Sequence, residues 1–149
     1  MLLNTLYTPE VITCGPGTTA LAAARLMRAR HAGDLVVVED SGEDRIPLGL
    51  VTDRDIVVEV LARDLDPAST PVSAFMRKPL VLAEESEDAA VALERMRQHG
   101  IRRLPVIGRD KRLVGIVALD DLLRQLAATA GTLADIIAAE QNREQRQRR

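Results

Sequence analysis

The chain repeats itself, and this internal repeat constrains its fold more than any other feature of the sequence. When the chain is aligned with itself at an offset of 69 residues, identical residues coincide along one stretch. The coinciding pairs are Ala20 with Ala89, Ala23 with Ala92, Met27 with Met96, Arg28 with Arg97, Leu35 with Leu104 and Val37 with Val106. The register slips by three residues where the turn Asp40–Arg45 is longer than the turn Arg109–Arg112. Two copies of one unit therefore account for most of the chain.

Each copy shows the order of apolar segments expected for a β-α-β-β-α unit. The first copy predicts an extended entry at Val11–Thr13, a helix capped by Thr18 or Thr19 that ends near Arg30, strands at Leu35–Val38 and Leu48–Thr52, and a helix ending near Arg63. The second predicts an entry at Leu80–Leu82, a helix Glu87–His99 capped by Ser86 and stopped by Gly100, strands at Leu104–Ile107 and Leu113–Val117, and a helix from Leu119 to about Thr129. In each copy we expect an antiparallel hairpin and a right-handed parallel crossover.

Composition shifts divide the chain into three parts. The segment Asp64–Pro71 contains two prolines and reads as a linker, so we expect a first unit at 1–66 and a second at 67–130. Val72–Met76 reads as a short turn that packs across to the other unit. After Gly131 we expect a short amphipathic helix within 131–149, followed by a fraying tail from Glu140 onward.

The composition argues against several classes of protein. The formal net charge of -2 and the aromatic content of 1% disfavour nucleic-acid binding, which needs cations and base-stacking rings. One cysteine, Cys14, allows no internal disulfide and no thiolate metal cluster. No apolar run approaches the length of a membrane span and no signal peptide is evident, so we expect a cytoplasmic protein with no membrane partner.

Each unit closes on a strand, a tight turn and the first turn of a helix. In the first unit this stretch is Gly49–Asp55, with a hydroxyl at Thr52 and a carboxylate at Asp55, three residues apart and therefore on the same side. The free N–H groups of the helix point to the same place, so the junction could hold a sugar diol and a phosphate. Gly115–Asp121 repeats the spacing, with Ala118 in place of the threonine.

Paired β-α-β-β-α units that close on Gly-hydrophobic-x-Thr/Ser-x-x-Asp resemble a tandem pair of cystathionine β-synthase (CBS) domains. The match covers roughly Pro9–Ala128, and Gly49–Ile56 and Ile101–Val106 are typical of small stand-alone bacterial members. The resemblance implies an α/β fold with two units packed pseudo-symmetrically as one module, to which the sequence adds a short C-terminal helix. It further implies clefts that bind AMP, ADP or ATP, homodimers, and regulation of a protein that the sequence does not identify.

The resemblance also implies ligand-binding roles for individual residues. Thr52 and Asp55 would hold the ribose and phosphate in the first cleft, Arg54 would reach a phosphate, and Asp121 keeps the ribose position. Arg102 and Arg103 stand where the family often places cations that contact phosphate. The apolar slots for adenine would be Val11, Ile12, Thr13, Leu35 and Val36 in the first unit, and Leu80, Val81, Leu82, Leu104 and Pro105 in the second. No catalytic residue, metal ligand or cofactor is implied, although a nucleotide could bring Mg²⁺ with it.

Departures from the family pattern imply that the two clefts differ. Ala118 removes one hydroxyl, and Gly33 and Asp34 stand where the second unit has Arg102 and Arg103. Asp34 would repel a phosphate, whereas Arg102 or Arg103 could serve the cleft of Thr52 and Asp55.

The sequence leaves alternatives open. Asp55 and Asp121 also suit the first turn of any helix, where acids favour the helix dipole. A structural or assembly module with vestigial clefts, or binding of S-adenosylmethionine, is the alternative to a nucleotide sensor. A nucleotide hydrolase is disfavoured, because the sequence offers no nucleophile–base set.

Overall fold

The computed structural model describes residues 1–39 and 45–148, so most of the long turn predicted at 40–45 lies outside the described residues, as does Arg149. The first unit contains β1 (Thr13–Cys14), α1 (Ala20–Arg30), β2 (Asp34–Val38), β3 (Pro47–Thr52), α2 (Asp53–Asp55) and the π-helical turn η2 (Ile56–Leu61). The second contains β4 (Ala83–Glu84), α3 (Ala89–His99), β5 (Arg103–Ile107), β6 (Leu113–Ala118) and α4 (Leu119–Gln147). Two short 3-10 helices, η1 (Leu3–Thr5) and η3 (Val72–Ala74), precede the units.

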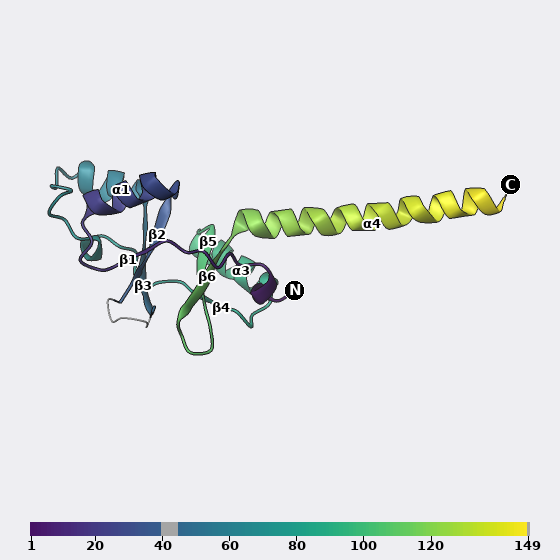
Figure 1. Cartoon of the computed structure of the whole chain (residues 1–149), viewed down its shortest axis with the longest axis horizontal. Helices are drawn as coiled ribbons and strands as arrows, with labels where there is room; N and C mark the ends of the chain where they lie inside the picture. Colours follow the sequence, from purple (N-terminus) through teal and green to yellow (C-terminus); the bar gives the residue numbers. More distant parts are fainter. Residues whose placement is uncertain (40–44, 149) are drawn as a thin grey trace.

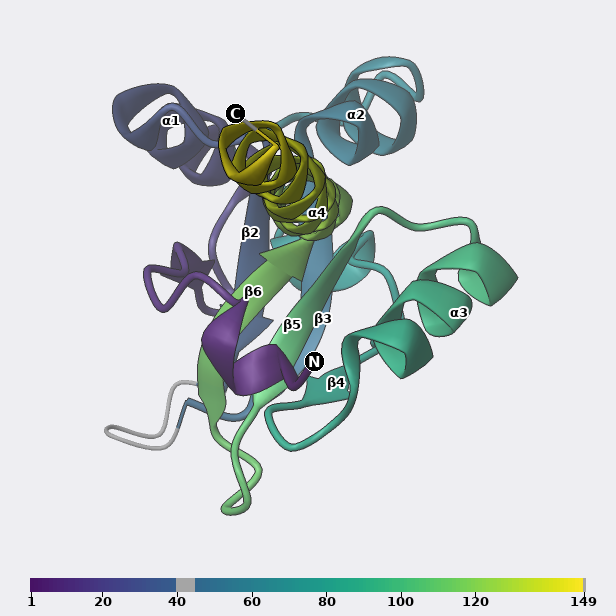
Figure 2. The same cartoon turned by 90° about the vertical axis from the view of Figure 1, so that its right-hand side faces the viewer.

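Each unit is built on a three-stranded mixed sheet, which confirms the predicted α/β class. β1 runs parallel to β2 with Thr13 opposite Val36, and β4 runs parallel to β5 with Ala83 opposite Val106. β2–β3 and β5–β6 are antiparallel hairpins, as the sequence predicts. Figures 1 and 2 show the two hairpins in the body of the molecule, with α1 and α3 on their respective units.

The residues that coincide in the repeat form two hydrophobic cores, one in each unit. In the first core Ala23, Met27, Leu35 and Val37 are buried, and the equivalent residues of the second unit are buried in the second core. Those equivalent residues are Ala92, Met96, Leu104 and Val106. The same residues recur because each pair occupies the same place in a separate close-packed core.

Two helix starts differ from each other in how well the sequence predicts them. Thr19 caps α1 by accepting a hydrogen bond from the Ala22 amide at 3.1 Å, as expected. The cap predicted at Ser86 is wrong, because Asp88 accepts from the Ala90 amide at 2.9 Å and α3 begins at Ala89. The predicted entry at Leu80–Leu82 likewise precedes the strand, which is Ala83–Glu84.

The two units exchange short segments. Leu3 of η1 is fully buried in the core of the second unit, and Val72 of η3 is fully buried in the core of the first. The exchange continues along the chain, since Thr8 pairs with Ile116 of β6 and Arg77 pairs with Leu50 of β3. Each unit therefore completes its core with a segment that precedes the other unit, and this ties the two into one body.

The C-terminal part differs most from expectation. A single 29-residue helix, α4, replaces the predicted helix ending near Thr129, the short helix after Gly131 and the fraying tail. Figure 1 shows it extending well away from the body. Among the described residues α4 alone is long and apolar enough, by length and composition, to cross a membrane, whereas the sequence predicted no such segment. One such helix is weak evidence of a span, because helices of soluble proteins can share this length and composition, and α4 carries Arg124 and Asp135 within its apolar stretch.

Candidate functional site

A cleft of about 400 Å³ lies between the two units, a size within the range of about 300–1,000 Å³ usual for small-molecule sites. The residues that line it are Asp34, Leu50, Thr52, Arg77, Gly100, Ile101, Arg102, Arg103, Ala118 and Asp120. Asp34 and Arg103 occupy equivalent positions in the repeat, at the starts of β2 and β5, and Thr52 and Ala118 are equivalent at the ends of β3 and β6. Equivalent residues of both units thus meet in one cleft.

Asp34 and Arg103 form an ion pair across this cleft. The hydrogen bond to Asp34 raises the pKa of the Arg103 guanidinium above its usual value. The Asp34 side chain is 16% exposed and that of Arg103 is 45% exposed, so the arginine keeps an open side. Asp34, which the sequence predicts to repel a phosphate, is therefore the ion-pair partner of Arg103 in this structure.

Two further arginines of the cleft are also paired with acids. Arg102 donates to Asp120 at 3.0 Å, and Arg77 donates from Nε and Nη2 to Asp55 Oδ1 at 3.2 and 3.1 Å. A guanidinium has five N–H donors, so one or two bonds leave others available. Three cations that retain donors at one cleft can accept an anionic group such as a phosphate.

Asp55 is held by its own helix start. Its Oδ2 accepts from the Thr52 amide at 2.9 Å, while the Thr52 hydroxyl accepts from the Asp55 amide at 3.1 Å, which together form a capping box. Asp55 is 8% exposed and also binds Arg77. These contacts give the carboxylate a structural role whether or not a ligand is bound, as the helix-start interpretation predicts.

Asp121 repeats half of this arrangement. Its Oδ2 accepts from the Ala118 amide at 3.3 Å and its Oδ1 accepts from Arg124 at 3.1 Å. Ala118 has no hydroxyl to return a bond to the helix. The two helix starts therefore differ by the one substitution that the sequence singles out.

The structure brings together some of the predicted site residues. Thr52, Arg102 and Arg103 line the cleft, whereas Arg54, Asp55 and Asp121 are absent from its lining. Leu35, Val36, Leu104 and Pro105 are almost completely buried. The entry residues are partly exposed but also lie outside the lining: Val11, Ile12, Thr13, Leu80, Val81 and Leu82. The cleft therefore combines three arginines and two aspartates with apolar residues such as Leu50 and Ile101, and the adenine slots stay predictions.

Sequence reasoning missed Arg77 and Asp120. Arg77 reaches the cleft because its segment crosses from the linker to pair with Leu50, where the Arg77 amide donates to the Leu50 carbonyl at 3.0 Å. The exchange segment Val72–Met76 was the available signal, since Arg77 is the next residue. Asp120 lies one residue before the acid that the motif selects, so the motif spacing pointed to its neighbour.

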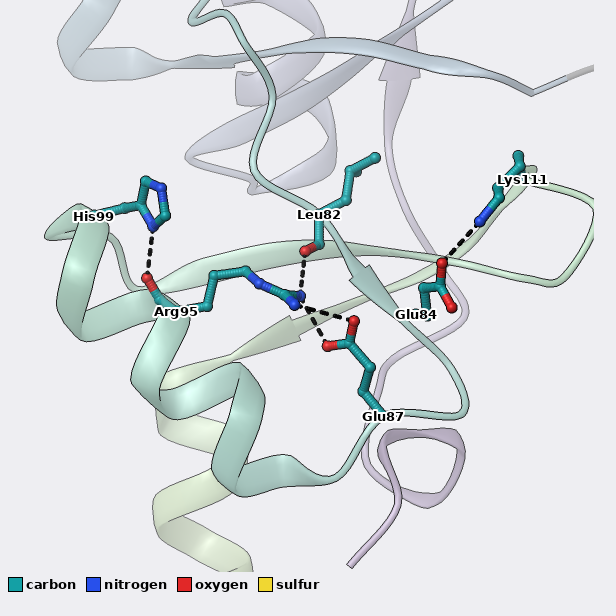
Figure 3. A network of polar contacts seen from close by, with 6 residues as sticks. All are labelled: Leu82, Glu84, Glu87, Arg95, His99 and Lys111. Atoms are coloured by element: carbon teal, nitrogen blue, oxygen red, sulfur yellow. Dashed lines mark hydrogen bonds and ion pairs between the residues drawn. The ribbon is translucent and has the colours of Figure 1, made fainter.

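A polar network holds the entry segment of the second unit. Arg95 of α3 donates to the Leu82 carbonyl at 2.6 Å and to both carboxylate oxygens of Glu87 at 2.8 and 3.1 Å (Figure 3). Leu26 occupies the equivalent position in the first unit, where the same arginine bond is impossible. Lys111 binds Glu84 at 2.7 Å and lowers the pKa of that carboxyl. The two entry segments, which the resemblance assigns to adenine slots, are thus anchored differently.

Within the described part of the chain, no group of three or more His, Cys, Asp or Glu residues could hold a metal ion. The cleft residues offer charge pairing and hydrogen bonding through three arginines, two aspartates and the Thr52 hydroxyl.

Comparison with known proteins identifies the family. The CBS domain profile matches residues 4–62 and 72–128, one match for each unit. A CBS domain-containing protein of Bacillus subtilis, YhcV, is 40% identical over 115 residues, which cover 77% of this chain and 78% of that protein. An uncharacterized protein of Methanopyrus kandleri, MK0525, is 34% identical over 115 residues, which span 77% of this chain but 57% of the archaeal protein.

Solved structures share the architecture. Hypoxic Response Protein I, crystallised with two coordinated zinc ions, is 31% identical with a TM-score of 0.74, over 83% of this chain and 98% of that one. The CBS domain protein PAE2072 of Pyrobaculum aerophilum, complexed with AMP, is 24% identical with a TM-score of 0.73, over 86% of this chain and 99% of that one. The CBS pair of MJ0100, complexed with 5-methylthioadenosine and S-adenosyl-L-methionine, is 22% identical with a TM-score of 0.74, over 87% and 98%. The last two comparisons support the fold alone. The chain belongs to the CBS domain family and consists of a tandem pair of CBS domains followed by a long helix.

Proposed function

We propose that this chain is a regulatory module that binds an adenosine nucleotide, AMP, ADP or ATP, in the cleft between its two CBS domains. It has no catalysis of its own and signals to a partner protein through changed packing of the domains. The observation that carries the proposal is the convergence of Arg77, Arg102 and Arg103 on one cleft. We place its action in the cytoplasm, where adenosine nucleotides are abundant.

The charges of the cleft suit a phosphate better than a neutral ligand. Phosphate oxygens accept from the planar donors of arginine in pairs, and such charge-assisted bonds are stronger than neutral ones. The relative PAE2072, which shares this fold, is complexed with AMP, and we propose the same class of ligand here. The relative MJ0100, complexed with S-adenosyl-L-methionine, supplies the alternative.

Binding at Arg103 would change the contact between the domains. A phosphate that takes donors from Arg103 competes with Asp34, which belongs to the other domain. A ligand shifts a conformational equilibrium only when it prefers one arrangement, and loss of this inter-domain pair provides such a preference. The partner protein would read the resulting change in packing.

Isothermal titration calorimetry with AMP, ADP, ATP, S-adenosylmethionine and GTP tests the proposal. We expect an adenosine ligand to bind and GTP to bind less tightly. Arg103→Met should weaken binding at least about tenfold, because a hydrogen bond to a charged group contributes about 1.5–3 kcal/mol. Arg109→Met, an equal change of charge in the turn at the far end of the β5–β6 hairpin, is the matched control and should leave the affinity unchanged. Absence of binding by every adenosine ligand at millimolar concentration would reject the proposal.

One observation favours a second candidate, an assembly module with vestigial clefts. All three arginines of the cleft are paired with carboxylates of the chain itself, so part of their charge is already compensated. An assembly module would show no nucleotide binding and no effect of Arg103→Met in the same titrations.

A further inference from the structure

The helix α4 carries an apolar stripe for which its own domains offer no cover beyond the first turns. Leu122 is buried against the core of the second domain, but Leu126, Leu133, Ile136 and Ile137 are 66%, 59%, 59% and 57% exposed. Every described residue from Leu126 to the end of the helix is exposed. A helix in water owes most of its stability to packing of an apolar face, so this stripe requires a partner.

The stripe follows the spacing of a coiled-coil seam. Leu119, Leu122, Leu126, Thr129, Leu133 and Ile136 alternate at three and four residues, and Leu123, Ala130 and Ile137 lie beside them on the same face. At about 1.5 Å per residue the helix is about 44 Å long, which makes room for several turns of pairing. After Ile137 the seam positions become Glu140 and Arg143.

From the first turns of α4 the stripe continues into an apolar groove on the body of the second domain. This groove, of about 240 Å³, lies between the start of α4, the N-terminal segment and α3. The residues that line it are Met1, Leu6, Ala89, Leu93, Leu119, Leu122, Leu123, Gln125, Leu126 and Thr129. A helix laid along the stripe would therefore also cover the groove.

We propose that α4 pairs with α4 of a second copy of this chain in an antiparallel coiled coil centred near Ala130. In this register Leu126 faces the second copy's Ile136 and Thr129 faces its Leu133, while Leu123 and the second copy's Ile137 flank the seam, offset by two residues along the helix axis. The stripe is thus complementary to itself when one helix is reversed, and the second copy's Ile136 and Ile137 come to lie over the groove.

Charge selects the antiparallel orientation over the parallel one. In a parallel pair the seam would oppose Glu140 to Glu140 and Arg143 to Arg143, and like charges at such positions destabilise pairing. In the antiparallel pair the basic end of one helix, with Arg143 and Arg146, runs beside Asp120 and Asp121 at the start of the other. The two helix dipoles are then also oppositely directed.

A second copy suits the stripe better than a lipid surface does. A helix that lies on a membrane carries lysine or arginine along its polar face, whereas Arg124 is the one cation between Leu119 and Glu140. A helix that crosses a membrane would place Arg124 and Asp135 in hydrocarbon, which is unfavourable unless they are paired. Membrane binding is therefore an outcome that the test must exclude.

Analytical ultracentrifugation of the full chain, from low micromolar to near-millimolar concentration, tests the pairing. We expect the wild-type protein to sediment with twice the mass of one chain. Leu133→Glu with Ile137→Glu should weaken association at least tenfold and reduce the helical circular dichroism, because the unpaired end of α4 is no longer stabilised. The matched control, Ala128→Glu with Ala138→Glu, adds the same charge to exposed positions on the side of the helix away from the stripe and should remain a dimer.

Disulfide trapping tests the orientation. Ala130→Cys should form a cross-linked dimer on oxidation, while Thr129→Cys should not, because only a parallel pair brings two copies of residue 129 face to face. The native Cys14 is buried, so the wild-type protein serves as the unlinked control. Trapping through Thr129→Cys alone would overturn the antiparallel register. A monomeric wild-type protein, association that survives the stripe glutamates, or sedimentation of the monomer with neutral or anionic vesicles would overturn the proposal itself.

Discussion

Asp34 and Arg103 occupy equivalent positions in the two CBS domains, carry opposite charges and pair with each other across the cleft. If positions 34 and 103 carried the same charged residue, two like charges would face each other across the cleft. The pair joins the two domains at the cleft, and under the proposed function a phosphate bound at Arg103 competes with Asp34 for its donors.

The first prediction concerns the acid of this pair. Asp34→Asn should tighten binding of AMP about fivefold, because removing one charge near a phosphate is worth about 1 kcal/mol in a solvated cleft. Calorimetry measures the change. Asp110→Asn, in the turn at the far end of the β5–β6 hairpin, carries the same change of charge and should leave the affinity as it was. Unchanged or weaker binding by Asp34→Asn would mean that Asp34 does not compete with the ligand.

The second prediction separates the two motif acids by stability. Asp55→Ala should lower the free energy of unfolding by about 2 kcal/mol, because it removes a cap worth about 1 kcal/mol together with the pair to the half-exposed Arg77. Asp121→Ala should cost less, about 0.5–1 kcal/mol, since its bond to Ala118 is longer and Arg124 is 76% exposed. Urea unfolding of both variants measures the difference, and equal losses would contradict the capping-box explanation.

The contacts of Asp55 with its own helix start make Asp55→Ala an ambiguous variant in binding experiments. Loss of binding in Asp55→Ala could result from a damaged helix start as well as from a lost ribose contact. Asp55→Asn retains an oxygen that can accept from the Thr52 amide, so it is the better variant for a test of the ribose role. If Asp55→Asn binds AMP as wild type does, Asp55 serves the fold alone.

The third prediction concerns the glycines that open the two motifs. A Cβ at position 115 would meet the ring of Tyr7 and lie 2.7 Å from the Thr8 carbonyl oxygen, whereas a Cβ at position 49 would meet the flexible side chain of Met76. Gly115→Ala should therefore cost about 3 kcal/mol and Gly49→Ala about 1 kcal/mol, the upper and lower parts of the range for overpacking. Thermal unfolding of the pair checks the order, and a larger loss at Gly49 would contradict the crossing-segment geometry.

The fourth prediction concerns the exchanged segments. Leu3 is fully buried in the second domain although it precedes the first, so Leu3→Ala should cost about 3 kcal/mol, as for other buried leucines. Leu2→Ala, at the neighbouring residue with 48% exposure, is the control and should cost much less. Equal stability of Leu3→Ala and wild type in urea would show that the N-terminal segment is not part of the second core.

Much of the fold could be predicted from the sequence because the residues that coincide in the repeat are the residues buried in the two cores. Residues such as Ala23 and Ala92 or Leu35 and Leu104 coincide because each pair occupies the same place in a separate core. The hairpins followed from apolar runs separated by polar turns. These features depend on local pattern, which a single chain displays directly.

The helix α4 was mispredicted because a glycine ends many helices. The sequence predicts separate helices on either side of Gly131, and glycine just beyond the end of a helix commonly takes a left-handed conformation. Here Gly131 lies within a continuous helix, flanked by alanines and leucines with high helix propensity. A single glycine costs about 1 kcal/mol in a helix, which strong helix formers on both sides can offset.

The ion pairs between cleft residues could not be predicted from the sequence, since they depend on how the two domains face each other. The pairing of Asp34 with Arg103 and the approach of Arg77 to Asp55 join residues 69 and 22 positions apart. Periodicity fixes which face of a strand is buried, but it does not fix the arrangement of two sheets. For this reason the sequence predicts that Asp34 repels a phosphate, whereas in the structure Asp34 is the partner of Arg103.

The central claim, that an adenosine nucleotide binds the native module, is tested most directly by the unfolding temperature of the full chain as AMP is titrated, with GTP as comparison. A ligand that binds only the native state stabilises it by about 2.7 kcal/mol at one hundred times its dissociation constant. We expect AMP, or ADP or ATP in its place, to raise the unfolding temperature progressively and GTP to do so much less, and Arg103→Met to shift the rise to higher concentration. An unfolding temperature that no adenosine ligand moves at millimolar concentration would contradict nucleotide binding by this module.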